Sequence, residues 1–443
     1  MRLFHAAAST LALAIIAAQP ALAEDLATKK AIEAEYDTYL APLFLDFHQH
    51  PELGFREKRT AGIMAAELRK AGLEVTEGVG GTGVVGILRN GKGPTILIRA
   101  DMDGLPVEEK TGLAYASKDK QIGEDGKEYN VMHACGHDTH ITAMIATARR
   151  LAATKAQWKG TLMFIVQPAE EGVRGAKAMM EDGLYQRFGK PDYALAFHVK
   201  AEMTTGTVAA SEGIQYSSSD TLDVRVPGIG THGASPHLGK DPVYIASQIV
   251  TALQSIDSRE ISPLKPVVVT VGSIHAGTTY NIIPDEANLK LTVRANDEAT
   301  RAQVIAAVER IAVNIGKANG LPDSMPVTVT KFSGTPVTNN DPALAKRLNA
   351  AMARELGAAA VVPFEQANMG AEDFAYFVDP ALGVPGYYFA VGGTTPERLA
   401  AAKAGGPAIA GHHSPLFQVA PRESITLGAR AMVAAVMDLA KAK

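Results

Sequence analysis

The chain has 443 residues, 47% of them hydrophobic, with 43 lysines and arginines against 47 aspartates and glutamates. This length exceeds one ordinary domain, so two domains are expected. The nearly even charge balance provides no strongly basic surface, which argues against nucleic acid or an acidic membrane as a partner.

The first 23 residues have the pattern of a signal peptide. Arg2 precedes an apolar run, and the small residues "ALA" stand before Glu24, so cleavage is expected after Ala23. The alternative is a retained membrane anchor, but the apolar run is short and Pro20 favours cleavage. The mature protein is expected in the periplasm, or else secreted, with no membrane association.

Residues 24–216 read as strands that alternate with helices. Helical patterns over 30–71 are interrupted by "HQHPELGFREK", and two adjoining strands, 83–90 and 94–103, follow around a glycine turn. A helix is predicted after residue 137, then strands at 161–166 and 193–199 with a helix near 173–182 between them. This alternation predicts an α/β fold with a mostly parallel, helix-covered sheet.

Residues 217–332 have a different pattern, typical of a small α+β domain inserted into the larger one. The predicted strands are 221–228, 266–274, 286–296 and 326–332, and the predicted helices are 241–257 and 298–318. The α/β pattern resumes over 333–443, with a helix at 342–356, a strand at 386–393 and a helix at 423–442. Between the last two, the Ala- and Gly-rich segment 396–411 reads as a loop or short helix.

The glycines of "GVGGTG" (78–83) superficially fit a dinucleotide-binding fingerprint. That fingerprint must open a helix, whereas these glycines lead into another strand. A hairpin turn is therefore predicted.

Five polar clusters lie at or just after the carboxyl ends of predicted strands, the edge where open α/β sheets bind ligands. They are Asp101 with Asp103; His133, Cys135 and His137; Glu170 with Glu171; His198; and His412 with His413. Taken singly, each has an ordinary structural interpretation. Together they form the donor set that zinc-like ions accept: thiolate, imidazole and carboxylate.

Cys135 is the only cysteine, so it cannot form an internal disulfide. Its thiol is buried and inert, bridging between chains, reactive, or a metal ligand; the surrounding clusters favour the last. A pair of metal ions is the expected cofactor. Of the adjacent Glu170 and Glu171, one can face a metal while the other handles protons beside a metal-bound water.

Eight ordered motifs resemble the amidohydrolase subfamily of metallopeptidase family M20, which contains hippurate hydrolases, N-acyl-amino-acid deacylases and plant auxin-conjugate hydrolases. The motifs are "RADMDGLP", "HACGHDTH", "QPAEEG", "FHV", "GTHGASPH", "NIIPDEA", "MGAEDFAYF" and "HHSPLF", and the resemblance spans about residues 35–437.

The resemblance implies a di-metal, aminopeptidase-like catalytic domain made of 24–216 and 333–443. Glu170 matches the general base, and Asp103 matches an aspartate that orients a ligand. Zinc is the expected metal, with manganese, cobalt and nickel as alternatives. His412 is a weaker candidate, and His133 and His140 match no assigned role. The implied metal ligands are Cys135, His137, Glu171, His198 and His413.

The inserted domain resembles the family's lid, which is also its usual dimerisation surface, so a homodimer is expected. His232 matches a histidine that reaches the active site across the dimer and holds the scissile carbonyl oxygen. Asn281 and Arg294 match substrate-contacting positions. The usual lysine before the lid histidine is missing from 228–231, which makes substrate preference less transferable.

The implied activity is hydrolysis of N-acyl or N-aroyl amino acids by metal-activated water. A dipeptidase or carboxypeptidase is the alternative within the family, because both substrate types place an amide next to a carboxylate. A non-catalytic metal- or solute-binding protein is disfavoured, because binding alone needs no second glutamate at 170.

Overall fold

A computed structural model describes residues 26–442, which divide into two compact units. The first unit runs to Gly213 and also contains Asn340–Glu365 and the chain from Phe377 onward; the second contains Ile214–Asn339 and Gln366–Tyr376. The predicted inserted segment, 217–332, falls within the second unit. The predicted signal peptide lies outside the described residues.

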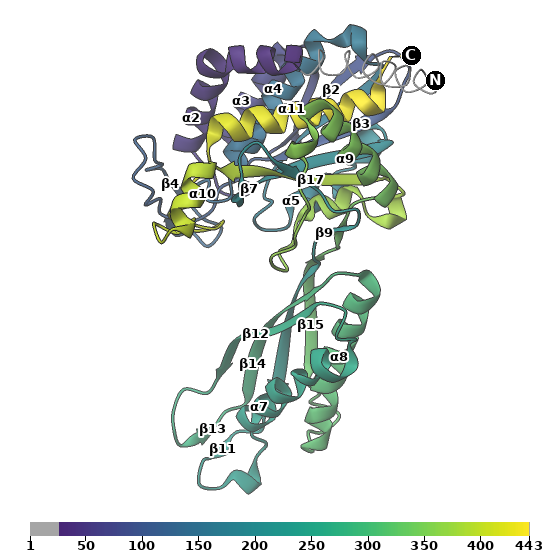
Figure 1. The fold of residues 1–443 in the computed structure, drawn as a ribbon. Helices are drawn as coiled ribbons and strands as arrows, with labels where there is room; N and C mark the ends of the chain where they lie inside the picture. Colours follow the sequence, from purple (N-terminus) through teal and green to yellow (C-terminus); the bar gives the residue numbers. More distant parts are fainter. Residues whose placement is uncertain (1–25, 443) are drawn as a thin grey trace, which may run out of the picture. The chain divides into compact units, whose positions relative to one another are not determined.

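The first unit is built on a seven-stranded sheet with the order β1-β2-β6-β3-β7-β17-β8 (Figure 1). β6, β3, β7 and β17 are mutually parallel, whereas β2 and β8 pair antiparallel with their neighbours. The predicted mostly parallel sheet is therefore confirmed. The strands are β1 Glu74–Val79, β2 Gly83–Asn90, β3 Thr95–Asp101, β6 Gly160–Gln167, β7 Tyr193–Thr204, β8 Val208–Ala209 and β17 Gly386–Thr394.

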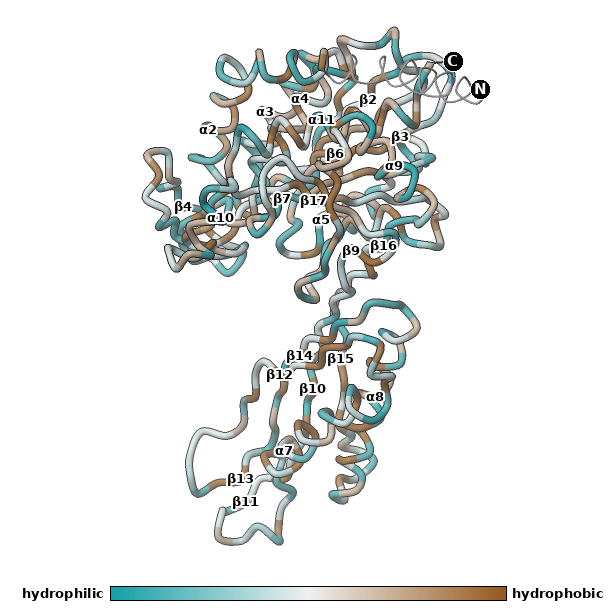
Figure 2. The backbone as a smooth tube through the Cα atoms, viewed as in Figure 1, coloured by the Kyte–Doolittle hydropathy of each residue, from teal (hydrophilic) through white to brown (hydrophobic). Residues whose placement is uncertain are grey.

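Helices cover this sheet, and its central strands are buried along most of their length. Figure 2 shows hydrophobic residues along β6 and β17, as expected for strands with both faces covered. One apolar core joins the sheet to α2, α3, α4, α9 and α11. The helices are η1 Tyr36–Leu40, α2 Ala41–Gln49, α3 Lys58–Lys70, α4 His137–Ala153, α5 Gly175–Glu181, α6 Leu184–Phe188, α9 Pro342–Leu356, α10 Pro396–Lys403 and α11 Pro421–Ala440.

One pairing differs from the sequence-based prediction. β2 and β3 are not adjoining strands, because β6 lies between them, antiparallel to β2 and parallel to β3. Glycine permits this close insertion: a Cβ on Gly160 would lie 2.3 Å from the carbonyl oxygen of Pro94. A local turn signal cannot reveal a third strand that comes much later in the chain, at Gly160–Gln167. The predicted hairpin at 78–83 is confirmed, since β1 pairs antiparallel with β2.

The second unit has a four-stranded antiparallel sheet of order β12-β14-β10-β15 and two long helices. Asp241 and Asp297 cap the helices by accepting backbone N–H groups, which satisfies otherwise unpaired donors. The predicted helix 241–257 ends earlier, at Leu253, and a short π-helix, η4 (Ile256–Glu260), follows. The elements are β10 Ser219–Pro227, α7 Pro242–Leu253, β12 Val267–Ala276, β14 Glu286–Ala295, α8 Glu298–Ala318 and β15 Thr328–Thr335.

Short elements complete the described chain. β11 (Thr231–His232) pairs with β13 (Ile282–Ile283), β9 (Ile214–Tyr216) with β16 (Thr338–Asn339), and β4 (Lys120–Ile122) with β5 (Glu128–Asn130). No helix within residues 26–442 is long and apolar enough to cross a membrane. The 3-10 turns are η2 Lys155–Gln157, η3 Pro236–Leu238, η5 Ala358–Ala360, η6 Asp373–Phe377 and η7 Pro380–Leu382.

Candidate metal centre

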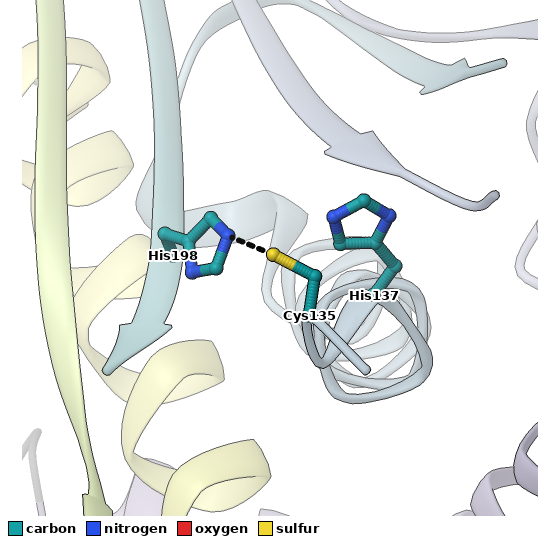
Figure 3. A group of neighbouring side chains, drawn as sticks. All are labelled: Cys135, His137 and His198. Atoms are coloured by element: carbon teal, nitrogen blue, oxygen red, sulfur yellow. Dashed lines mark hydrogen bonds between the residues drawn. The ribbon is translucent and has the colours of Figure 1, made fainter. Parts of the chain in front are cut away.

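Cys135, His137 and His198 meet where α4 begins beside strand β7 (Figure 3). Cys135 lies two residues before His137, the first residue of α4, and His198 projects from β7. Gly136, between Cys135 and His137 in the sequence, has φ +90°, and a Cβ there would lie 2.5 Å from Val199 Cγ1. Glycine at this position therefore lets the start of α4 approach β7 closely enough for the two side chains to meet.

The predicted ligands lie in two groups that share one atom. Cys135, His137 and His198 form one group, and Cys135, Glu171 and His413 form the other; within each group the potential ligand atoms are within 4.8 Å of one another. The Cys135 Sγ lies 3.3 Å from His198 Nε2 (Figure 3). These residues would suit two metal ions, with the Cys135 thiolate available to both.

Two buried polar atoms test whether metal ions fit this site. His137 Nδ1 is 2.8 Å from the carbonyl oxygen of Asp103, which leaves Nε2 as the free nitrogen of the ring. Among the described residues, neither His137 Nε2 nor Glu171 Oε1 has a hydrogen-bond partner, and the two atoms are 3.9 Å apart. A buried unpaired polar group costs about 1–3 kcal/mol, so a cation held between them would satisfy both.

The electrostatics also favour cations. Burial and then the charge of Glu171 raise the pKa of the Cys135 thiol well above its usual value. Burial also raises the pKa of Glu171 to about 7. Divalent metal ions would reverse both effects, because they stabilise the thiolate and the carboxylate directly.

Asp103 holds both the histidine and the glutamates. Its two carboxylate oxygens accept the backbone N–H groups of Glu170 and Glu171, each at 3.0 Å, while its carbonyl oxygen contacts His137. The carboxylate of Glu170 lies 4.0 Å from His137 Nε2, and Glu170 forms a further group of potential ligand atoms with His137 and Glu171. A water held there would be within reach of Glu170.

The two adjacent histidines near the C-terminus both reach the site, in different environments. His413 is more than half exposed, and its Nε2 lies 3.2 Å from Glu171 Oε2. His412 is largely buried, with Nδ1 at 3.7 Å from Cys135 Sγ. Burial and then Lys200 lower the pKa of His412 to about 3, which keeps it neutral beside the thiol. His412, the weaker ligand candidate by resemblance, thus lies directly beside the Cys135 thiol.

His140, to which the motif assigned no role, forms hydrogen bonds next to the candidate ligand His198. Its Nδ1 lies 2.5 Å from Asp101 Oδ1, and its Nε2 accepts the N–H of Val199 at 2.9 Å. Although burial opposes it, the charge of Arg99 holds the pKa of Asp101 well below its usual range. This buried series of hydrogen bonds, from Asp101 through His140 to Val199, fixes the backbone next to His198. By contrast, both ring nitrogens of His133 lack a partner among the described residues, and burial lowers its pKa to about 4.

Sequence reasoning missed two buried groups in "HQHPELGFREK", which was interpreted as an interruption. His48 lies between Asp138 (2.7 Å) and Glu109 (3.3 Å). Glu57, fully buried, accepts the N–H of Ala169 at 2.8 Å. His48 shares the buried face of α2 with Phe44 and Phe47, so helical spacing was a signal for its burial. Glu57 follows no strand, and the only signal for it was that charged residues recur in a segment rich in turn formers.

Three predicted substrate residues lie in the second unit. His232 in β11 pairs with Ile282 in β13, and the N–H of Gly233 donates to the carbonyl oxygen of Asn281, so His232 and Asn281 are neighbours on this ribbon. Both side chains are exposed. Arg294, on β14, donates to two uncharged oxygens, Thr292 Oγ1 and the carbonyl of Met369.

The chain is similar to known proteins over most of its length. Residues 97–407 match the family described as peptidase family M20/M25/M40. The chain is 41% identical over 335 residues to the hippurate hydrolase of Campylobacter jejuni, covering 75% of this chain and 83% of that protein. It is 36% identical over 362 residues to thermostable carboxypeptidase 1 of Saccharolobus solfataricus, covering 81% and 86% respectively.

A solved structure from Bacillus subtilis, described as a dinuclear metal-binding peptidase of the M20 family, matches with a TM-score of 0.73 at 30% identity, covering 92% of this chain and 98% of that one. The fold and the two ligand groups thus define a hydrolase with a site for two divalent metal ions. The chain belongs to peptidase family M20, within its amidohydrolases.

Proposed function

We propose that the protein hydrolyses the amide bond of N-acyl or N-aroyl amino acids, releasing a carboxylic acid and a free amino acid. The observation that carries the proposal is the position of Glu170, whose carboxylate lies 4.0 Å from the unpaired His137 Nε2, adjacent to both ligand groups. The similarity to a hippurate hydrolase supports this substrate class.

The two ions, held by Cys135, His137, Glu171, His198 and His413, would supply a water of lowered pKa and polarise the substrate carbonyl. Glu170 takes the proton of the attacking water and delivers it to the leaving nitrogen. Asp103 keeps Glu170 in place through the backbone N–H of that residue. His232, which by resemblance reaches the active site across the dimer, would stabilise the developing oxyanion, a contribution of about 3 kcal/mol for one donor, and Asn281 and Arg294 would bind the substrate. Zinc is the proposed metal, with manganese, cobalt and nickel as alternatives.

A carboxypeptidase or dipeptidase activity is the second candidate, because the Saccharolobus relative carries that name and an amide beside a carboxylate is common to both substrate types. A panel of N-acyl amino acids and dipeptides, assayed with each of the four metals, separates the two. Preference for the dipeptides would overturn the first proposal, and no hydrolysis with any metal would leave a metal- or solute-binding protein.

Glu170→Gln tests the role of the base. We expect kcat to fall by about 10²–10⁴-fold with two ions still bound, because the amide can hold a water but cannot accept its proton. Glu181→Gln, an exposed carboxylate on α5, is the matched control and should leave kcat unchanged. A Glu170→Gln enzyme with normal kcat would exclude this assignment.

We further propose that the chain is exported to the periplasm and forms a homodimer through the second unit. The N-terminal pattern supports the first statement. The edge position of β12 and the exposed Ile274 and Ile282 support the second. Mass spectrometry of the mature N-terminus and light scattering test them; an uncleaved chain or a monomer would contradict the respective proposal.

A further inference from the structure

Backbone hydrogen bonds hold the loop that carries Glu170 and Glu171 on both sides of Ala169. Ala169 has φ +46°, a left-handed conformation that costs a non-glycine residue about 1–2 kcal/mol. Its carbonyl oxygen accepts the N–H groups of Arg174 and Gly175, at 3.3 and 3.2 Å. Such a conformation persists only where the surroundings over-determine it. The backbone N–H of Ala169 therefore also needs a partner that holds it in place.

Glu57 provides that contact. It stands just before α3, is fully buried, and its Oε1 accepts the N–H of Ala169 at 2.8 Å. Three consecutive N–H groups, from 169 to 171, thus end on two carboxyl groups, Glu57 and Asp103. Asp103 binds the N–H groups of Glu170 and Glu171, and Glu57 binds the N–H of the residue before them, on the side of strand β6.

The second oxygen of Glu57 is anchored to the β1–β2 hairpin. Thr82 Oγ1 donates to Glu57 Oε2 at 2.5 Å, so the glycine-rich stretch 78–83 contributes its one hydroxyl to this network. Neighbouring contacts hold the same segment: a Cβ on Gly54 would lie 3.0 Å from the Cα of Ala169. Burial and then the charge of Asp103 raise the pKa of Glu57 to about 7. This carboxyl contacts loop backbone and a hydroxyl, and its neighbours pack against the same loop.

We propose that Glu57 is a positioning residue for the metal centre: by fixing the Ala169 amide, it aims the Glu171 carboxylate at the metal and so sets metal affinity. The inference rests on the proposed function only in taking Glu171 as a ligand. Partners that orient a ligand typically change metal affinity by about 10–100-fold when lost.

A purely structural role is the competing explanation, and Glu67 is the matched control. Glu67 is also a buried carboxyl of α3, but its hydrogen bonds go to Tyr39 and, at 2.6 Å, to Lys70, and none within residues 26–442 joins it to the loop. Loss of either carboxyl should lower the thermal midpoint of unfolding. Loss of Glu57 alone should weaken metal binding.

The test measures zinc affinity of the metal-free full chain by competition with a chromogenic chelator. Glu57→Leu keeps the buried volume but removes the acceptor, and we expect at least one of the two ions to bind about 10–100-fold more weakly. Glu57→Gln retains an acceptor oxygen and should stay within about threefold of the unmodified protein. Glu67→Leu should bind zinc normally.

Should Glu57→Leu fail to fold, Glu57→Asp replaces it, since the shorter side chain withdraws the carboxyl from Ala169 without removing charge; weaker binding than in Glu57→Gln is then expected. Normal zinc affinity in folded Glu57→Leu or Glu57→Asp, or an equal loss in Glu67→Leu, overturns the proposal. A protein that binds two ions but cleaves no amide refutes the proposed function and leaves this inference standing.

Discussion

Among the residues that the structure describes, the first unit of the molecule buries more ionisable side chains than the second. In the second unit, one apolar core formed by sheet residues and helices α7 and α8 accounts for most of the buried side chains. The first unit has a larger apolar core but also buries histidines, aspartates and glutamates at the strand ends. Burying ionisable groups is unfavourable unless they are paired.

The pairing also differs. In the second unit the buried carboxylate of Asp220 is fully matched by Arg301, with two hydrogen bonds of 2.7 and 2.9 Å. In the first unit, His137 Nε2 and Glu171 Oε1 are buried, lie 3.9 Å apart and have no hydrogen-bond partner among the described residues. Satisfied polar groups indicate a structural role, whereas unsatisfied ones that converge on one point indicate a ligand. That contrast locates the candidate metal centre in the first unit.

The largest expected effect comes from Cys135→Ala, which removes the atom shared by both ligand groups. We expect metal and activity to be lost together, with metal affinity falling by more than the roughly 10–100-fold typical of supporting residues. His133→Ala is the control, because its ring belongs to neither group; it should lose far less metal. Elemental analysis of both variants checks this, and equal metal loss would remove the distinction between the two motif residues.

Leu289→Ala tests whether the apolar core of the second unit contributes to stability without affecting metal binding. Leu289 is fully buried in β14, in the core of the second unit. Truncation should lower the free energy of unfolding by about 2–5 kcal/mol, through lost apolar burial and a cavity. Zinc stoichiometry of the folded protein should stay at the unmodified value. Denaturant unfolding followed by metal analysis measures both, and a fall in stoichiometry would show that the units are not independent in this respect.

His48→Gln has the smallest expected effect, and one that depends on pH. Burial lowers the pKa of His48, but the hydrogen bonds of Asp138 and Glu109 outweigh it and raise the pKa from 6.5 to about 9. Because the folded value is the higher, this stabilisation is fully present below pH 6.5 and is lost as the pH rises through 9. Its upper bound is roughly 3 kcal/mol.

Urea unfolding of His48→Gln at pH 6 and at pH 9.5 measures this difference. The variant should be clearly less stable than the unmodified protein at the lower pH and nearly equal to it at the higher. His237→Gln, an exposed histidine in the second unit, should show no such dependence. A loss for His48→Gln that is the same at both pH values would mean that His48 acts through packing rather than through its charge.

The amino-acid sequence by itself determined much of the local structure and the type of chemistry. Helices α8 and α9 begin and end at the predicted residues, because capping aspartates precede regular apolar spacing. The metal-capable residues were also identifiable, since parallel strands deliver their carboxyl ends to one edge of a sheet. These features depend on short-range patterns that a single segment carries.

Only the tertiary structure decided which segments meet. It placed β6 between β2 and β3, brought His412 beside Cys135, and buried Glu57 against Ala169 from 112 residues away. Hydrogen bonds between distant segments leave no periodic trace, because each partner needs only one suitable atom in the right place. The residue types at the candidate metal centre could therefore be predicted from the sequence. The hydrogen bonds that position these residues depend on long-range packing and could not.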